Sequence, residues 1–274
     1  MLRSRVITAL ILAAIIFSLV LLLPPTALTV FLALLVVCGG GWEVAGLAGL
    51  DGAGARTGWL LGLLAASAGL VWLTHFPSAL PWIFGLSTAV WLLLGIWLTR
   101  ASMARIEPAR FQPTKLLIGG AITLAAFIAM SWAHFYSPWR LAALLVVIAM
   151  ADIGAYFAGH WIGGAKLAPR ISPGKTVAGA VGGLLAAAAG AAVCAWAMPG
   201  IPLSPGLAAV AGLVLAFISI VGDLTLSAFK RQRGVKDTSA LLPGHGGLYD
   251  RMDSLGAAAP VWALLLWWVT AGPA

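Results

Sequence analysis

Residues 205–254 read PGLAAVAGLVLAFISIVGDLTLSAFKRQRGVKDTSALLPGHGGLYDRMDS. They begin with an apolar run long enough to cross a bilayer, since about 20 helical residues span the hydrocarbon core. The charged segment that follows, defined here as residues 222–254, holds nine of the 24 Lys, Arg, Asp and Glu residues in the chain. Carboxylates bind hard cations and basic side chains bind phosphoryl oxygens. The charged segment is therefore predicted to hold metal ions and phosphates.

The rest of the chain is apolar in long blocks. Of its 274 residues, 62% are hydrophobic and 9% are charged, against about 25% charged in soluble domains. This composition predicts an all-α integral membrane protein, a polytopic helical bundle with about nine transmembrane helices. We assign residues 1–149 to N-terminal membrane helices and residues 150–274 to a catalytic membrane region. The predicted spans, separated at prolines and at the Gly39-Gly40-Gly41 run, are 6–23, 26–41, 57–74, 80–98, 115–132, 139–162, 176–198, 205–229 and 254–271.

The basic residues predict the orientation of the bundle. With the N-terminus in the cytoplasm and nine spans, 15 of the 16 Lys and Arg residues fall on the cytoplasmic side, and Arg140 alone falls outside. The first span, preceded by Arg3 and Arg5, is interpreted as an anchor, because its apolar run exceeds that of a secretory signal. The net charge of +8 is attributed to this orientation and to anionic lipids, and not to nucleic acid. The charged segment then faces the cytoplasm at the inner membrane.

The two cysteines and the small residues are interpreted as packing residues. Cys38 and Cys194 fall near opposite membrane faces, so no disulfide is expected. The glycines of residues 176–198 permit close helix packing. Such small-residue faces also permit a homodimer without requiring one.

Asp223 is the strongest single indication of function in the charged segment. It lies within the eighth predicted span, and ionisable residues inside membrane spans are expensive and usually functional. Asp223 and Ser227 share a helix face, and Lys230 and Arg231 follow at the membrane surface. Asp223 is predicted to bind a metal, with an ion pair as the alternative. Lys230 and Arg231 either clamp a phosphate or are snorkelling cations that end the span.

The second half of the charged segment adds further candidate residues. The backbone of Gly246 and Gly247 could expose amides to phosphate oxygens. His245 is either a general acid or base or a hydrogen-bonding loop residue. Asp250 and Asp253 fall near the start of the ninth predicted span, where Asp253 could be an N-cap and Asp250 is the better candidate ligand. Two Asp-bearing helix ends that meet could hold two divalent cations, so we predict a two-metal Mg²⁺ site of Asp223, Asp250 and Asp253.

The charged segment resembles the signature of phosphatidate cytidylyltransferase, the CDP-diacylglycerol synthase family. The match runs without a gap as Ser227-x-Phe-Lys230-Arg231-x4-Lys236-Asp237-x-Ser239-x2-Leu242-Pro243-x-His245-Gly246-Gly247-Leu248-x-Asp250-Arg251-x-Asp253. The resemblance implies a membrane enzyme that joins CTP to phosphatidate and releases pyrophosphate. It implies catalytic roles for Asp223, Asp250, Lys230, Arg231 and His245, and substrate contacts by Ser227, Lys236, Asp237, Gly246, Gly247 and Arg251.

A second block, in residues 152–176, resembles the same family. Asp152 and Tyr156 share a helix face in the sixth span, and Lys166-Leu-Ala-Pro and Ser172-Pro-Gly-Lys175-Thr176 follow. The resemblance implies that this block holds the nucleotide or the lipid phosphate, through Lys166, Ser172, Lys175 and Thr176. Residues 1–149 match only as generic spans.

Two positions depart from the family pattern. Leu226 stands where the family often has Glu, and Ala178 stands where a polar or acidic residue is common. If that Glu binds metal or substrate, the site here has one carboxylate fewer.

Two other functions compete with the preferred one. A CTP-dependent kinase of a lipid alcohol would also need nucleotide, metal and membrane. A secondary anion transporter would use Asp152 and Asp223 as relay groups near the midplane. The polar residues crowd one membrane face, which disfavours transport.

Overall fold

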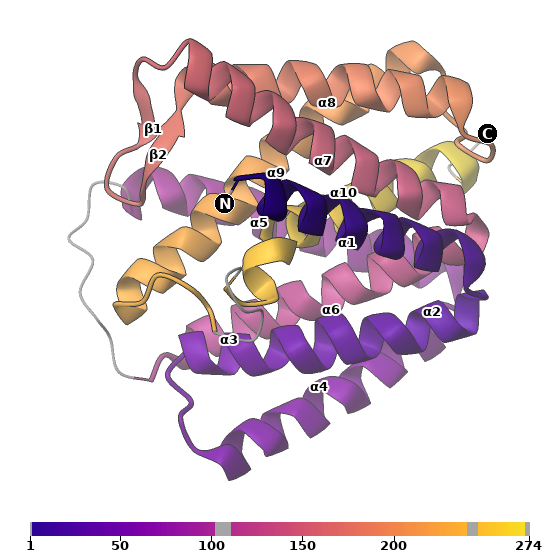
Figure 1. Ribbon diagram of the computed structural model, residues 1–274. Coiled ribbons are helices and arrows are strands. Elements are labelled where there is room, and N and C mark those ends of the chain that lie inside the picture. Colours follow the sequence, from indigo (N-terminus) through magenta and orange to yellow (C-terminus); the bar gives the residue numbers. More distant parts are fainter. Residues whose placement is uncertain (1, 102–110, 240–245, 272–274) are drawn as a thin grey trace.

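The computed structural model describes residues 2–101, 111–239 and 246–271. Figure 1 shows a bundle of roughly aligned helices with one short hairpin at its edge. The elements in chain order are α1 Leu2–Leu22, α2 Pro25–Leu32, the π-helix η1 Ala33–Gly40, α3 Gly41–Leu47, α4 Ala53–Leu73, the 3₁₀ turn η2 Pro77–Ala79, α5 Leu80–Ala101, α6 Pro113–Tyr136, α7 Pro138–Trp161, β1 Lys166–Ala168, β2 Ser172–Thr176, α8 Val177–Ala197, α9 Pro205–Arg233 and α10 Tyr249–Ala271.

The polytopic helical membrane fold predicted from the sequence is confirmed. All nine predicted apolar segments are helical. Among the residues that the structure describes, eight helical stretches are long and apolar enough to cross a membrane, and the first segment adds a shorter apolar helix, Ile11–Leu22. Helices α2, α6, α7 and α9 each begin with proline in the first turn. There the missing N–H has no helical partner to lose, so proline sets the start of a helix at little cost.

The predicted break at Gly39-Gly40-Gly41 is wrong. The helix continues through these glycines as η1 and then α3, so that one span runs from Pro25 to Leu47. The glycines allow close packing here. A Cβ on Gly39 would lie 2.6 Å from the side chain of Leu248, and one on Gly41 would lie 2.6 Å from that of Leu63. The extra turns carry residues 42–47 to the charged segment.

The loop between α7 and α8 forms a hairpin that the all-α prediction did not include. β1 and β2 pair antiparallel, with Lys166 opposite Thr176 and Ala168 opposite Ser172. Ile171, at 1% exposure, anchors the turn. The Thr176 side chain then caps α8, because its Oγ1 accepts a hydrogen bond of 3.0 Å from Gly179 N.

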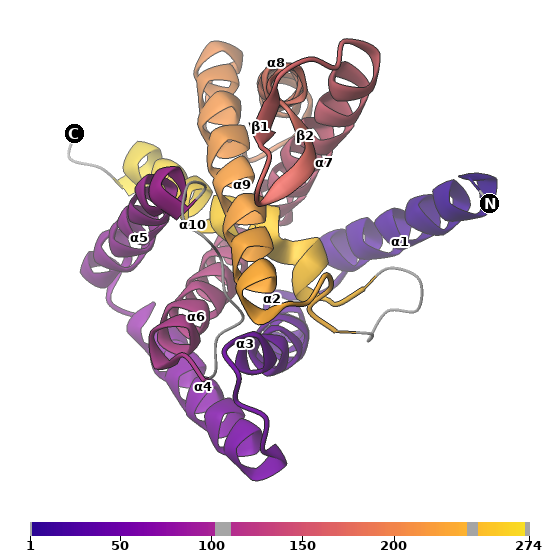
Figure 2. The same ribbon diagram turned by 90° about the vertical axis from the view of Figure 1, so that its left-hand side faces the viewer.

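Helices α6, α9 and α10 form the centre of the bundle, and α4 and α5 lie at its edge (Figure 2). Helices α7 and α8 approach so closely that small residues are required between them. A Cβ on Gly183 would lie 2.8 Å from Ala151 O, and one on Gly182 would lie 2.8 Å from Gly154 O. The packing interpretation of these glycines is therefore confirmed. This close contact brings α7 beside the hairpin that leads into α8. Cys38 and Cys194 are both free thiols, as expected.

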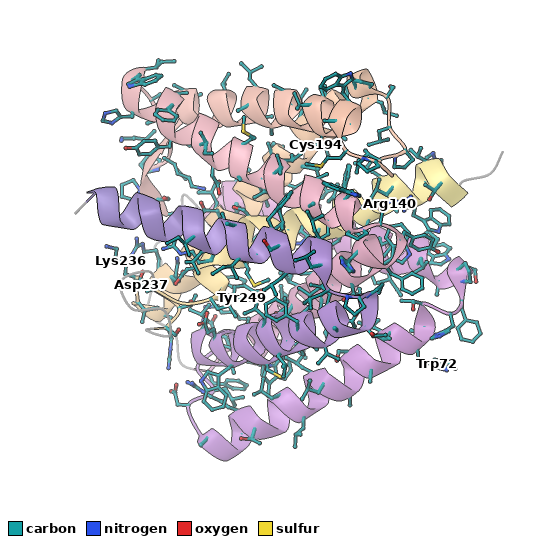
Figure 3. The ribbon with its side chains drawn as sticks, turned by 45° about the vertical axis from the view of Figure 1, so that its right-hand side comes forward. Trp72, Arg140, Cys194, Lys236, Asp237 and Tyr249 are labelled. Atoms are coloured by element: carbon teal, nitrogen blue, oxygen red, sulfur yellow. The ribbon has the colours of Figure 1, made fainter. Side chains whose placement is uncertain are left out.

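The two ends of the bundle differ in charge. Figure 3 shows Lys236 and Asp237 at one end and Arg140 and Trp72 at the other. The hairpin and the C-terminal end of α9 lie at the first end, whereas α10 ends at the second (Figure 1). This arrangement agrees with the predicted separation of Arg140 from the other basic residues.

The predicted orientation can be tested at the two ends of α4. Ala55, in the first turn of this helix, and Ser78, five residues after its end, are both exposed. In a background with Cys38 and Cys194 replaced by Ala, Ala55→Cys should react with an impermeant thiol reagent only from the cytoplasmic side. Ser78→Cys should react only from outside. Labelling of both from the same side would refute the topology.

Candidate active site

Asp223 lies where the two sequence blocks meet. Its Oδ2 forms an ion pair with Nζ of Lys175, which extends from β2. Its Oδ1 accepts a hydrogen bond of 3.3 Å from Ser227 Oγ, one helical turn later in α9. The side chains of Lys175 and Asp223 are 26% and 33% exposed. The pair is thus accessible to a ligand, and the two blocks that were predicted to act together are in contact.

A groove of about 430 Å³ surrounds this pair, with walls from α7, α8 and α9. Asp152 and Tyr156 line it from α7, Lys175 from β2 and Asp223 from α9. Glycines and alanines form much of the remaining surface, so the backbone itself is close to the space. Tyr156 is 63% exposed, and its ring stacks on that of His160 with the centroids 6.0 Å apart. The groove therefore combines acidic, basic and aromatic side chains.

Asp253 belongs to the same electrostatic cluster. Asp152 and Asp253 each lie close enough to Asp223 for their charges to interact, and Lys175 interacts with both. Because α10 begins at Tyr249, Asp253 lies in the second turn of the helix and the N-cap interpretation is wrong. Its Oδ1 accepts a hydrogen bond of 2.7 Å from Ser254 N. The structure brings Asp253, from a third helix, toward Asp223.

Asp250 has a different environment. Its Oδ1 pairs with Nζ of Lys230 at 2.6 Å, and the two side chains are 9% and 14% exposed. Its Oδ2 accepts hydrogen bonds from Thr238 N at 2.8 Å and Gly247 N at 3.0 Å. Lys230 is therefore a buried ion-pair partner, and the snorkelling interpretation is wrong for it. The amide of Gly247, predicted to face phosphate, is engaged by Asp250.

The carboxylates have the ligand chemistry that a divalent cation requires. Mg²⁺ prefers carboxylate oxygens and is often bound by only one or two of them together with substrate phosphates. Asp223, with its partly exposed side chain and acidic neighbours Asp152 and Asp253, fits this use. Asp250 fits it less well, since its side chain is only 9% exposed and its two oxygens accept four hydrogen bonds from Lys230, Thr238 and Gly247. Within the described residues, no three His, Cys, Asp or Glu side chains are grouped closely enough to hold a metal ion by themselves.

The other predicted site residues lie around this centre. Arg231 is exposed, and its Nε is 3.4 Å from Ile171 O in the hairpin. Gly246 has φ of +82°, and a side chain there would approach both Asp237 and Asp250. Ser172 is partly buried, His245 lies outside the described residues, and the exposed members of the set are Lys166, Lys236, Asp237 and Arg251.

The chain is similar to known proteins over nearly its whole length. The model of the cytidylyltransferase family matches residues 3–269. The phosphatidate cytidylyltransferase of Pseudomonas aeruginosa is 40% identical over 275 residues, which cover 97% of both chains. The chain belongs to the cytidylyltransferase family. The resemblance found in the two sequence blocks is thereby confirmed, and membership of this family makes the protein an enzyme, a nucleotidyltransferase.

Shorter matches fall on other members of the family. The phosphatidate cytidylyltransferase of Brucella suis is 50% identical over 116 residues, 42% of each chain. That of Haemophilus influenzae is 40% identical over 139 residues, 49% of this chain and 48% of the relative.

Sequence reasoning missed Glu43. This side chain is 3% exposed, and its carboxylate binds the charged segment. A signal was present, since Glu43 is the one acidic residue in the first 50 and stands among apolar residues. Because a break was predicted at the preceding glycines, Glu43 was assigned to a loop and was not considered as a buried charge. Asp51 was missed too, and its two oxygens each lie 2.9 Å from Nη2 of Arg233.

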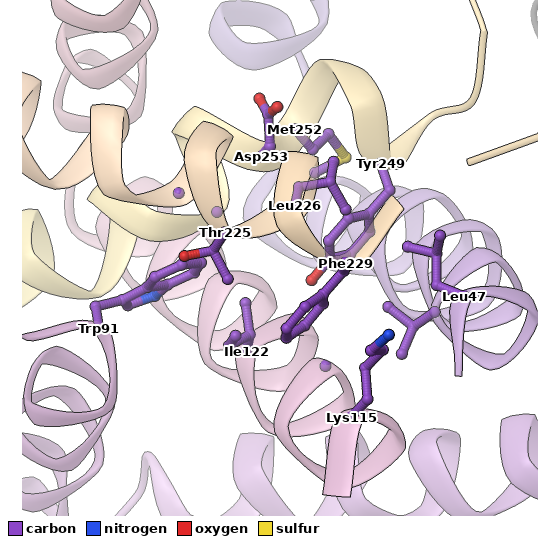
Figure 4. A pocket seen from close by; sticks show the side chains of 14 residues that line it. Leu47, Trp91, Lys115, Ile122, Thr225, Leu226, Phe229, Tyr249, Met252 and Asp253 are labelled. Atoms are coloured by element: carbon purple, nitrogen blue, oxygen red, sulfur yellow. The ribbon is translucent and has the colours of Figure 1, made fainter. Parts of the chain in front are cut away.

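The departure at Leu226 can now be located. Leu226 is 3% exposed and lines a small cavity that also contains Lys115 and Phe229 (Figure 4). The Lys115 ammonium lies 5.2 Å from the centre of the Phe229 ring. The groove at Asp223 is lined by another face of α9. A Glu at position 226 would therefore enter this cavity, which Lys115 and Asp253 also line, rather than the groove. Ala178, the other departure, is partly buried in the first turn of α8.

This placement yields a prediction for Leu226→Glu. The new carboxylate should pair with Lys115, so the protein should insert, and the Mg²⁺ concentration for half-maximal activity should stay within about twofold of wild type. Leu226→Gln, which cannot form an ion pair, is the matched control and should be less heat-stable than Leu226→Glu. A large shift in the Mg²⁺ requirement of the Glu variant alone would show that position 226 does reach the metal.

Proposed function

We propose that this enzyme transfers the cytidylyl group of CTP to phosphatidate, giving CDP-diacylglycerol and pyrophosphate. The observation that carries the proposal is the Lys175–Asp223 pair, exposed in a groove between membrane helices. In this pair a lysine, which suits a phosphate, contacts a carboxylate, which suits a divalent cation. The names of the relatives support this choice of substrates.

The reaction requires charge to be neutralised more than it requires covalent catalysis. An oxygen of the phosphatidate phosphate attacks the α-phosphorus of CTP, and the bond from that phosphorus to the bridging oxygen of the β-phosphate breaks. The nucleophile is already an oxyanion, so a covalent enzyme intermediate is unnecessary. A bound divalent cation would neutralise phosphate charge and stabilise the pyrophosphate that leaves.

The residues of the groove suit these tasks. When the nucleotide binds, Lys175 leaves Asp223 and contacts a phosphoryl oxygen instead. Asp223 is then free to act as the main carboxylate for the cation. Asp152 and Asp253 add negative charge that draws the cation to this position. Lys166 and Arg231, exposed on β1 and near the C-terminal end of α9, attract the polyanionic substrates. Tyr156 and His160 offer a stacked aromatic surface at the edge of the groove.

The position of the site follows from its surroundings. We place it at the cytoplasmic face of the inner membrane, where CTP is available and where the charged segment falls under the positive-inside rule. Lipid reaches the groove from the bilayer and nucleotide reaches it from water.

Labelled nucleotides test the proposal directly. Purified protein in detergent with phosphatidate and Mg²⁺ should incorporate label from [α-³²P]CTP into lipid and release label from [γ-³²P]CTP as pyrophosphate. Transfer of the γ-label to a lipid alcohol would instead identify a kinase. Vesicle uptake of an anion without either lipid product would identify a transporter. Protein denatured by heat serves as the control for all three outcomes.

A further inference from the structure

Glu43 connects the N-terminal half of the chain to the residues on both sides of 240–247. Its Oε1 accepts hydrogen bonds from Ser239 Oγ at 2.6 Å and Leu248 N at 2.9 Å. Its Oε2 accepts hydrogen bonds from Thr238 Oγ1 at 2.7 Å and Tyr249 N at 2.7 Å. One buried carboxylate thus binds two residues before that stretch and two after it. Such an arrangement fixes the separation of the two ends.

The same contacts extend to Asp250. The Thr238 hydroxyl lies between the two acids, 2.7 Å from Glu43 Oε2 and 2.9 Å from Asp250 Oδ2, and its single hydrogen can bond to one of them at a time. Asp250 in turn holds the Lys230 ammonium at 2.6 Å. A change at Glu43 is therefore transmitted through Thr238 and Tyr249 to Asp250 and its lysine.

Gly247 shows how closely this part of the chain is fitted. A Cβ there would collide with the Thr238 hydroxyl and would lie 2.6 Å from Glu43 Oε2. Tyr249 is fixed on its other side as well, because its ring packs against Gly40 and its hydroxyl lies 3.3 Å from Thr123 Oγ1. The start of α10, which carries Asp250 and Asp253, is thus held by helices of the N-terminal half.

We propose that Glu43 is a positioning residue for nucleotidyl transfer: it binds residues 238–239 and 248–249 and so sets the position of Asp250, Lys230 and the first turn of α10. It touches no reacting atom. The expected effect on kcat rests on the proposed function. The role of Glu43 in holding residues 238–239 and 248–249 does not depend on it. No other side chain of this length supplies two acceptor oxygens, and Gln supplies only one.

Glu43→Gln is the decisive variant, because it keeps the shape of the side chain. The hydroxyls of Thr238 and Ser239 can rotate to accept from the new amide. The backbone N–H of either Leu248 or Tyr249 cannot, and must face an NH₂ group. We expect kcat to fall between about tenfold and a hundredfold, as for misplacement of a catalytic group by a fraction of an ångström to 1 Å. The KM for CTP should change by less than about threefold.

A double-variant cycle separates positioning from general stability. If Glu43 acts through Asp250, Glu43→Gln combined with Asp250→Asn should be no slower than Asp250→Asn alone. If Glu43 only stabilises the fold, the two effects should multiply, and the proposal is overturned. Asp51→Asn is the matched control. It also removes an acid that joins the N-terminal half to α9, but it lies on the exposed Arg233 pair and should leave kcat within about twofold.

Hydrogen exchange makes the structural part independent of activity. The amides of Leu248 and Tyr249 should exchange at least tenfold faster in Glu43→Gln than in wild type, and those of α8 should be unchanged. Unchanged exchange at both amides would overturn the proposal even if the enzyme is active. Faster exchange in a chain that makes no CDP-diacylglycerol would refute the proposed function alone. Should Glu43→Gln fail to fold, Thr238→Val should lower kcat while Thr238→Ser keeps it, and equal rates would count against the inference.

Discussion

Asp223→Asn should slow CDP-diacylglycerol formation by roughly a hundredfold or more, because the loss of an anionic metal-binding oxygen removes several kcal/mol of transition-state stabilisation. Asn is nearly isosteric and can still accept from Ser227, so the helix should be intact. Removing a charge from a membrane helix also lowers its insertion cost. The protein should therefore purify in normal yield. The measurement is kcat for cytidylyl transfer over a range of Mg²⁺ or Mn²⁺ concentrations.

The metal dependence decides what the loss means. A metal role predicts that the Asn variant needs more divalent cation and recovers part of its rate at high concentration. Lys175→Gln is the matched control on the other side of the pair. It should raise the KM for CTP and leave the cation requirement of the enzyme nearly unchanged. Near-normal activity of Asp223→Asn with an unchanged Mg²⁺ requirement would remove Asp223 from the metal site.

Asp250→Asn should cause a loss of similar size for a different reason. The substitution leaves the Lys230 ammonium, 14% exposed, without its counterion, and breaking a buried pair in this way costs about 3–5 kcal/mol. It also replaces one acceptor oxygen by a donor among the amides of Thr238 and Gly247. We expect at least a hundredfold lower kcat, with a lower melting temperature.

The Mg²⁺ requirement again distinguishes the interpretations. If Asp250 orders the charged segment, the residual activity of the Asn variant should have the wild-type Mg²⁺ dependence. Lys230→Met combined with Asp250→Leu, which removes both charges, should recover thermal stability but not activity. A shifted Mg²⁺ requirement in Asp250→Asn would show instead that Asp250 is a direct metal ligand, as the sequence first indicated.

Much of this architecture could be predicted because it depends on local features. Apolar length and proline position determine the helices, since a span needs about 20 residues and proline begins but does not continue a helix. The prediction was wrong at the Gly39–Gly41 run, because glycine is typical both of helix breaks and of close helix packing. The close packing here depends on the side chains of Leu248 and Leu63, which are distant in the sequence.

The arrangement of the acids could be predicted only in part. The sequence identified Asp223, Asp250 and Asp253 as a group, and the family pattern added Asp152. Which acid lies near Asp223 depends on where α10 begins, and a start at Tyr249 instead of 254 changes the environment of both later aspartates. Glu43 could not be placed, because its partners are 195 to 206 residues away in the chain and no local pattern links them.

That separation also has a consequence for biosynthesis. At about 5–20 residues per second, a ribosome needs roughly 10–40 s to progress from Glu43 to the residues that bind it. During this interval the helix Pro25–Leu47 is in the membrane with a carboxylate that has none of its four final donors. Its place near the end of the span keeps that carboxylate within reach of headgroups and water. A nascent chain halted before residue 238 would keep Glu43 in this state, so synthesis of residues 238–249 is also the step at which the carboxylate of the second span gains its hydrogen-bond donors.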